Sequence, residues 1–318
     1  MTRRAWWAFA FMSIVWGGSY LLIKIAINGG FTAPDVAWLR VAIAAVLLGV
    51  VARRQLRSLR GRWWWVILFA VAEISIPFPL IAAGEVHVAS SLAAIIIASV
   101  PLLVTVLSLR FDPSERPTRA RAIGLLIGFT GVIALVGIDA TGSTAEALGA
   151  LAIFVAAIGY AIGPMVVKLG MQGLDSRATM GAALLIAAVI LAPFAAVDRP
   201  SRTPTLGAIA AVVTLGVLCT AIAFVVYALL IREAGTSRAT VITYVNPVVA
   251  VVLGVTLLGE RPGPGALAGL LLILAGSWLS TGGRIPPRHG WSRRSAARRS
   301  ERMKGGADGA AARMKCST

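Results

Sequence analysis

A single acidic residue, Glu73, lies deep inside a long apolar stretch of the chain, at 63–84. A charged side chain at the centre of a bilayer costs on the order of 2.5 kcal/mol, so such residues usually face a cavity and have a function. A carboxyl group in that setting holds a proton readily or binds a cation. Glu73 is therefore a candidate proton carrier or partner for a cationic group. The alternative is a neutral carboxyl that hydrogen-bonds to a neighbouring helix.

Arg40 is another charged residue inside an apolar stretch, in this case 34–52. Its long side chain can reach toward a polar cavity, toward Asp35, or toward lipid headgroups. Because a guanidinium group binds carboxylates and phosphates through two parallel hydrogen bonds, an anionic ligand is a further alternative. The sequence leaves structural pairing and ligand binding both open for Arg40.

Several amphipathic side chains are spread along the apolar stretches. Trp16 lies in the middle of its stretch, whereas tryptophans usually gather at the membrane interfaces. Trp16, Tyr20 and Lys24 follow one another at four-residue intervals, which places them on one face of a helix. The residues predicted to line a substrate-binding cavity are Trp16, Ser19, Tyr20, Arg40, Glu73, Tyr160, Tyr244 and Asn246.

Prolines occur well inside several of the apolar stretches. Each one removes a backbone donor and frees a carbonyl group of the preceding turn. In a bilayer such breaks are tolerated only where protein or a water-filled cavity satisfies the backbone. We predict hinges, or else simple packing kinks, at Pro77, Pro101, Pro164 and Pro247.

Motifs of known enzyme classes are missing from the sequence. The two histidines, His87 and His289, lie outside the apolar stretches, and the two cysteines, Cys219 and Cys316, are too differently placed to form a disulfide framework. No motif for zinc binding, phosphate binding or nucleophilic catalysis is present. We therefore expect neither an enzyme nor a cofactor or metal site.

The composition indicates a membrane protein. The 318 residues are 58% hydrophobic and 14% charged, whereas a soluble domain has about a quarter of its residues charged. About 20 apolar residues are needed to cross the hydrocarbon core as a helix. Stretches that approach or reach that length lie at 5–23, 34–52, 63–84, 88–109, 122–138, 147–167, 178–197, 203–231, 239–259 and 262–283. The predicted fold class is an all-α integral membrane protein with ten transmembrane helices.

Two parts of the chain repeat one another 145 residues apart. The sequence Glu-Arg-Pro at 115–117 recurs at 260–262, and a Gly-Leu-Leu segment follows each copy, at 124–126 and 269–271. Repeated halves are typical of membrane transporters. Because five spans fall in each half, the halves enter the membrane in opposite directions, which predicts an inverted five-plus-five repeat. The predicted divisions are 1–140, 141–282 and a basic tail at 283–318.

The net charge of +17 is explained by membrane topology rather than by nucleic-acid binding. If the N-terminus is cytoplasmic, 25 of the 30 Lys and Arg residues fall on the cytoplasmic side, in agreement with the positive-inside rule. We therefore expect a multi-pass protein of the cell (inner) membrane with both termini in the cytoplasm. The tail holds ten of these basic residues, so we expect it to be disordered or to contact anionic lipid.

Several segments together carry a resemblance to a known family; they are Trp16 to Tyr20, Pro34 with Arg40, Ile76 to Phe78, Ser90 to Ile95, Pro101 with Leu102, and Gly259 to Arg261 with Gly269 and Gly276. They are similar to the ten-helix branch of the drug/metabolite transporter superfamily, which has two EamA domains. The resemblance covers about 3–282. It implies a carrier or exporter of small polar metabolites with a central cavity.

The predicted function is gradient-driven secondary transport, in the export direction, of a small polar or amphipathic metabolite by alternating access. A flippase for a lipid or lipid-linked precursor is the alternative, and it needs a cavity that opens sideways to the bilayer. The expected partners are the small-molecule substrate and the lipid bilayer, with a homodimer as a further option. Nucleic acid is not an expected partner.

Overall fold

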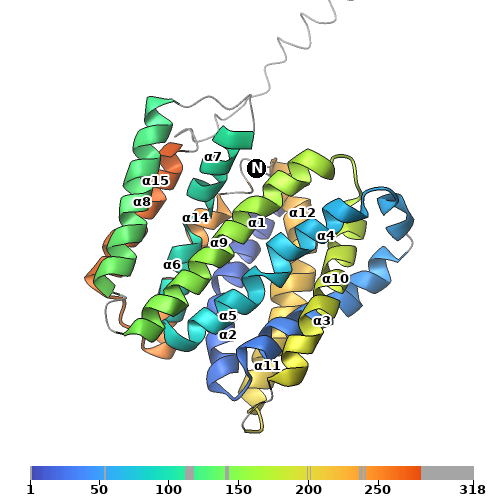
Figure 1. Cartoon of the computed structure of the whole chain (residues 1–318), viewed down its shortest axis with the longest axis horizontal. Coiled ribbons are helices and arrows are strands. Elements are labelled where there is room, and N and C mark those ends of the chain that lie inside the picture. Colours follow the sequence, from blue (N-terminus) through green and yellow to red (C-terminus); the bar gives the residue numbers. More distant parts are fainter. Residues whose placement is uncertain are drawn as a thin grey trace, which may run out of the picture. The chain divides into compact units, whose positions relative to one another are not determined.

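The computed structural model describes residues 2–53, 55–111, 118–139, 143–198, 200, 202–235, 239 and 241–280. In this part of the chain every regular element is helical, as predicted (Figure 1). Seven of the described helical segments are long and apolar enough to cross a bilayer, and two shorter apolar helices accompany them. The first Glu-Arg-Pro motif at 115–117 and the tail at 283–318 lie outside the described residues.

The helices follow the ten predicted stretches. In the first half they are α1 and α2 (Arg3–Gly17, Ser19–Asn28), α3 (Ala33–Ala52), α4, η2 and α5 (Trp63–Ala70, Val71–Ser75, Pro77–His87), α6 and α7 (Ser90–Ile97, Val100–Phe111), and α8 (Arg119–Asp139). In the second half they are α9 (Thr144–Gly170), α10 (Ser176–Val197), α11, η3 and α12 (Leu206–Gly216, Val217–Ile222, Ala223–Ala234), α14 (Ile242–Leu258) and α15 (Pro264–Ser280). A short helix, η1 (Leu56–Leu59), connects α3 to α4.

Both halves contain the same irregularity in their third span. The elements η2 and η3 are π-helices, and Ser75 and Thr220 hold equivalent positions in them, 145 residues apart. Ser75 Oγ donates to the carbonyl of Ala70 at 3.1 Å, and Thr220 Oγ1 donates to the carbonyl of Leu215 at 2.8 Å. Each hydroxyl thus supplements the backbone bonding that the wider turn loosens. The duplicated sequence therefore carries a duplicated structural feature.

Helices of the two halves pack against one another reciprocally. The second spans, α3 and α10, are in contact, as are the fifth spans, α8 and α15 (Figure 1). The first span of each half contacts the third span of the other, because α2 packs on α11 and α9 packs on α5. This exchange of contacts agrees with an inverted repeat related by a pseudo-two-fold axis.

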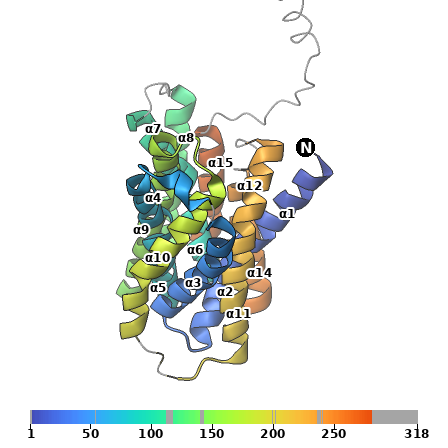
Figure 2. The ribbon, with the colours of Figure 1, turned by 90° about the vertical axis from the view of Figure 1, so that its right-hand side faces the viewer.

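The N-terminus lies beside the C-terminal end of α12, as Figure 2 shows. Thr2 Oγ1 donates to Glu233 Oε2 at this end of the bundle. We call this the inner end, following the predicted topology. At the opposite, outer end, Thr205 N donates to the carbonyl of Gly29 at 2.9 Å and connects the α10–α11 loop to α2.

The structure interrupts two of the four spans in which proline hinges were predicted. Pro77 begins α5 one residue after the end of η2, and Pro101 is the second residue of α7, after a break between α6 and α7. Pro164 and Pro247 lie inside the continuous helices α9 and α14, so the chain is not interrupted there. A helix survives a proline where neighbouring groups satisfy the freed carbonyl. A hinge motion at any of the four remains a prediction.

Glycines of the repeated motif bring α8 and α15 together. A methyl group added at Gly276 would collide with the backbone of Gly124 and Gly128. One added at Gly269 would lie 2.9 Å from the carbonyl oxygen of Gly131. Between helices in lipid, close backbone approach at small residues supplies van der Waals contact where no hydrophobic driving force exists. The repeated glycines therefore pair the last helices of the two halves.

We predict that Gly276→Ala lowers the free energy of unfolding by about 1–3 kcal/mol, because α15 must move away from α8 to admit the methyl group. The measurement is thermal unfolding of the purified protein in detergent. The matched control is Gly207→Ala in α11, where an added methyl group meets nothing within 4 Å. Equal stability of the two variants would show that this glycine contact does not hold α8 on α15.

Candidate functional site

Arg40 is a buried charge that reaches from α3 to the π-helix of the other half. Its side chain is 8% exposed, and Nε donates to Thr220 Oγ1 at 2.8 Å. The guanidinium carbon lies 4.2 Å from the centre of the Phe78 ring, a favourable cation–π distance. Asp35, one partner considered for Arg40, instead accepts a hydrogen bond from Thr32 at the start of α3. No carboxylate of the described residues pairs with Arg40.

Glu73 projects from η2 toward α9. A Cβ atom at position 163 would overlap with Glu73 Oε2, so Gly163 provides the space that this carboxyl occupies. That oxygen is buried and has no hydrogen-bond partner in the described part of the chain. The neighbouring helix therefore accommodates the carboxyl oxygen without donating to it. This arrangement differs from the hydrogen-bonded alternative considered for Glu73.

Several tyrosines interact electrostatically with Arg40 or Glu73. Tyr160 of α9 interacts electrostatically with both Arg40 and Glu73, and Tyr20 of α2 interacts with Arg40 and Tyr160. Tyr227 of α12 interacts with Glu73. The predicted cavity residues Arg40, Glu73, Tyr20 and Tyr160 are therefore neighbours in space, although they come from four different spans.

Trp16 forms an aromatic wall beside η3. Its Nε1 donates to the carbonyl of Cys219 at 3.2 Å, which satisfies a backbone group of the π-helix. Its ring contacts Tyr227 and Phe224, with centroid distances of 5.0 and 6.2 Å. Ser19 Oγ donates to the carbonyl of Trp16 at 2.7 Å, where α1 gives way to α2.

The remaining predicted residues, Tyr244 and Asn246, lie on α14 near its N-terminal end. Asn246 Oδ1 is buried without a hydrogen-bond partner in the described residues. Helix α1 packs closely against α14 at the backbone carbonyl of Asn246. A Cβ atom added at Gly17 of α1 would lie 2.8 Å from that oxygen. Tyr244 is half-buried. A substrate contact by either residue remains a prediction.

A second buried carboxyl, Glu85, was missed by the sequence analysis. The third span was expected to end at 84, but α5 continues to His87, and Glu85 is 0% exposed. Neither of its carboxyl oxygens has a hydrogen-bond partner in the described part of the chain. Lys24 Nζ donates to the backbone carbonyls of Glu85 and Val88, at 2.5 and 2.9 Å. The sequence feature that could have indicated Glu85 was Lys24, because a positive charge at the end of the first span needs a polar partner on a neighbouring helix.

Glu260 of the repeated motif connects the two halves at the outer end. Gly259 ends α14 with a left-handed φ of 67°, which turns the chain so that Glu260 faces α6. Its carboxylate accepts hydrogen bonds from Ser90 N and Oγ, both at 2.8 Å, and from Ser91 N at 3.0 Å. It therefore caps a helix of the first half from a loop of the second. Burial alone would raise the pKa of Glu260, but the hydrogen bonds from Ser91 and Ser90 outweigh it and lower the pKa below its ordinary value.

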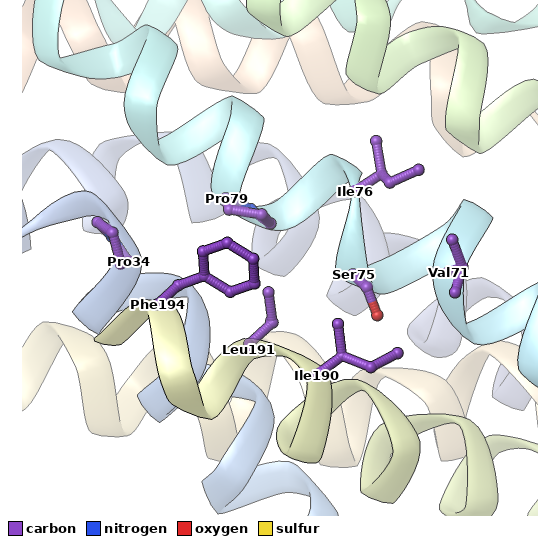
Figure 3. A pocket seen from close by; sticks show the side chains of 8 residues that line it. All are labelled: Pro34, Val71, Ser75, Ile76, Pro79, Ile190, Leu191 and Phe194. Atoms are coloured by element: carbon purple, nitrogen blue, oxygen red, sulfur yellow. The ribbon is translucent and has the colours of Figure 1, made fainter. Parts of the chain in front are cut away.

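An apolar groove lies between η2–α5 and α10 (Figure 3), and Glu73 is not among the residues that line it. It has a volume of about 300 Å³, and it is lined by Pro34, Val71, Ser75, Ile76, Pro79, Ile190, Leu191 and Phe194. The Ser75 hydroxyl is the one polar side-chain group among these residues, and it already donates to Ala70. Phe194 and Ile76 are exposed on the membrane-spanning surface. The groove therefore suits an apolar group of the bilayer.

Comparison with known proteins places this geometry in a family context. The model of the EamA-like transporter family matches residues 4–137 and 147–282. The inner membrane transporter YedA of Escherichia coli, a protein described as uncharacterized, is 30% identical over 262 residues, which cover 78% of this chain and 80% of YedA. A transporter of Archaeoglobus fulgidus is 26% identical over 280 residues, covering 87% of this chain and 98% of that protein.

A third relative has a more specific name. The "Probable terminal-alkyne amino-acid exporter" of Streptantibioticus cattleyicolor is 28% identical over 286 residues, covering 87% of this chain and 93% of the relative. A protein of known crystal structure is 21% identical to this chain and superimposes on it with a TM-score of 0.63. The match covers 87% of this chain and 97% of the other chain. At that level of identity the match supports the fold alone.

We predict that Glu260→Gln lowers the free energy of unfolding at pH 7 by about 2 kcal/mol, because the hydrogen bonds to Ser90 and Ser91 lose their charged acceptor. Since the pKa of Glu260 is lowered in the folded state, its stabilisation is present above the ordinary glutamate pKa and is lost as pH falls through the lowered value. The unfolding curves of the wild type and the variant in detergent should therefore converge below about pH 4.

The control for this prediction is Asp198→Asn, which changes an exposed carboxyl at the same end of the bundle. It should leave stability at pH 7 unchanged. A pH-independent difference between Glu260→Gln and the wild type would contradict the assignment of this stabilisation to the carboxylate charge.

Proposed function

Because the chain belongs to the EamA-like transporter family of the drug/metabolite transporter superfamily, we propose that it exports a small zwitterionic metabolite by gradient-driven alternating access. The observation that carries the proposal is a buried arginine, Arg40, that has no carboxylate partner in the described residues and that interacts electrostatically with Tyr160, as Glu73 also does. A buried charge without a partner of its own is a natural place for an oppositely charged ligand.

Arg40 binds the anionic end of the substrate. Its hydrogen bond to Thr220 uses Nε, and the two terminal amino groups of the guanidinium retain the capacity for a carboxylate. Phe78 and Thr220 hold the guanidinium group from two sides. A guanidinium group that is fixed in this way loses little rotamer entropy when a ligand binds.

Glu73 binds the cationic end of the substrate or carries a proton in exchange for it. Its unpartnered oxygen and its electrostatic interaction with Tyr160 support either role. The aromatic wall of Trp16, Tyr227 and Phe224 supplies apolar surface for the remainder of the molecule. Such a site selects a small amphipathic zwitterion such as an amino acid.

The name of the Streptantibioticus relative supports this substrate class and the export direction. That protein is named as an amino-acid exporter and aligns with 87% of this chain. The inner-membrane location of YedA, in turn, supports placing this chain in the cell (inner) membrane. Basic residues at the inner end, such as Arg62 and Lys168, support a cytoplasmic position for both termini. Lipid contact by the tail at 283–318 and a homodimer stay predictions.

The flippase alternative receives less support from the structure. A path for a lipid headgroup needs polar side chains that face the bilayer. The groove between α5 and α10 opens on the lipid-facing surface but contains no charged residue. Arg40 and Glu73 contact residues of α9 and η3 instead.

The direct test of the function is a comparison of matched bacterial strains with and without the chain. The strain that expresses the protein should accumulate an amino-acid-like metabolite in the medium and retain less of it in the cells. Untargeted mass spectrometry of both fractions measures this difference. Identical profiles, with the protein present in the membrane fraction, would count against export.

We predict that Glu73→Gln reduces pH-driven flux of that metabolite in proteoliposomes by about tenfold or more, which corresponds to about 1.4 kcal/mol. Glutamine fills the space beside Gly163 but can neither carry a proton nor form an ion pair with an ammonium group. The control is Asp198→Asn, whose flux should equal that of the wild type. Unchanged flux in Glu73→Gln would remove Glu73 from the transport cycle.

A further inference from the structure

A cluster of charged residues surrounds the buried Glu85 at the outer end of the bundle, and the proposed function gives these residues no role. The cluster consists of Lys24 on α2, Glu85 itself on α5, and Glu260 between α14 and α15. The Glu85 side chain interacts electrostatically with Lys24 and with Glu260. The Glu85 carboxyl group is therefore influenced by a cation and by a second carboxyl group.

The surroundings of Glu85 fit a neutral carboxyl. The residue is 0% exposed, and its two carboxyl oxygens have no hydrogen-bond partner among the described residues. An ionised carboxylate without a partner at such a site costs several kcal/mol. Glu260 is different, because three hydrogen bonds from Ser90 and Ser91 satisfy its charge. One carboxyl of the cluster is thus built to be ionised and the other to hold a proton.

Lys24 is close to Glu85 but is bonded to its backbone rather than to its carboxyl group. The ammonium group donates to the carbonyls of Glu85 and Val88 at the C-terminal end of α5. A cation is favourable there because the last carbonyls of a helix carry partial negative charge. The carboxyl of Glu85 offers the same ammonium group a stronger partner whenever it becomes ionised.

We propose that Glu85 is a proton-binding site of the outer end, and that loss of its proton to the outer water transfers Lys24 from the α5 carbonyls to the Glu85 carboxylate. The step breaks the O–H bond of the carboxyl group and releases one proton. The new carboxylate and the Lys24 ammonium form an ion pair, so the buried net charge falls by one. The C-terminal end of α5 then loses its cap, which frees the short connection to α6.

The other charged and titratable groups around Glu85 are consistent with this exchange. From α2 and α3, Tyr20 and Arg40 interact with it electrostatically. Helix α9 packs on α5 next to Glu85, at Gly84, through the uncharged residues Gly149 and Ile153. His87, on α5 itself, is exposed. Arg40 is held by Thr220 and Phe78. The Lys24 ammonium group, by contrast, already bonds to the backbone of Glu85, so Lys24 is the cation placed to pair with the carboxylate.

Two tyrosines lie within electrostatic range of the two buried carboxyl groups. Tyr20 interacts with Glu85 and with Tyr160, and Tyr160 interacts with Glu73. Glu73 and Glu85 are 12 residues apart on one span, which corresponds to about 18 Å along a helix. Proton sites at both Glu73 and Glu85 would make the proton the coupling ion of the proposed transport, so this inference rests on the proposed function.

Infrared spectroscopy of the full-length protein in lipid nanodiscs tests the proton site, with pH as the only variable between about 5 and 10. The wild type should show a protonated-carboxyl band at neutral pH that weakens at alkaline pH. Glu85→Gln should remove one component of this band, and Glu73→Gln should leave that component in place. Asp198→Asn should leave the whole band unchanged.

Lys24→Met tests the partner without changing Glu85. Without its cation, the Glu85 component should titrate at a pH higher by about 1–3 units. A band that Glu85→Gln leaves intact at every pH would overturn the proton site, and a titration that Lys24→Met does not move would overturn the exchange with Lys24. The readout needs no transported substrate, so a failed export assay and a failed proton titration remain distinguishable.

Discussion

The structure depends on one constraint, namely that no water satisfies backbone groups within the bilayer. Regular helices meet it by themselves, but the third span of each half does not, because it contains a π-helix. Side chains make up the deficit there. Ser75 and Thr220 donate to carbonyls five residues earlier, and Trp16 donates to the carbonyl of Cys219. The polar groups that permit the irregular backbone are thus among the polar groups of the site.

This constraint explains why the candidate site lies where the two halves meet. The Thr220 hydroxyl accepts from Arg40 of the other half while it donates to Leu215. Such a bond fixes the orientation of a buried guanidinium group without neutralising its charge. Glu73, by contrast, is accommodated by the absence of a side chain at Gly163. The Arg40 guanidinium is held by a hydrogen bond, and the Glu73 carboxyl is accommodated by the space at Gly163; we propose that both bind the substrate.

Much of the fold was predictable, because the length of an apolar stretch and the repeat at a 145-residue offset are direct consequences of membrane thickness and duplication. The π-helices were not, since their i−5 hydrogen bonds depend on tertiary neighbours that no local pattern encodes. For the same reason, Pro77 and Pro101 break helices whereas Pro164 does not. Glu85 was missed because charge was used to end the third span, yet α5 continues past this residue and buries it, with Lys24 of another span bonded to its backbone carbonyl.

The two halves share their backbone but differ in the residues that surround it. The two π-helix hydroxyls make equivalent hydrogen bonds, yet Thr220 meets Arg40 whereas Ser75 faces an apolar groove with Ile190 and Leu191. Position 185, the counterpart of Arg40 at the repeat offset, is leucine. In the alternating access that we propose, a symmetric scaffold allows the inward-open and outward-open states to be close in energy, because exchanging the halves interconverts their packing. Charges confined to one half then let a ligand or a proton favour one state, since a ligand shifts an equilibrium only through different affinities for its states.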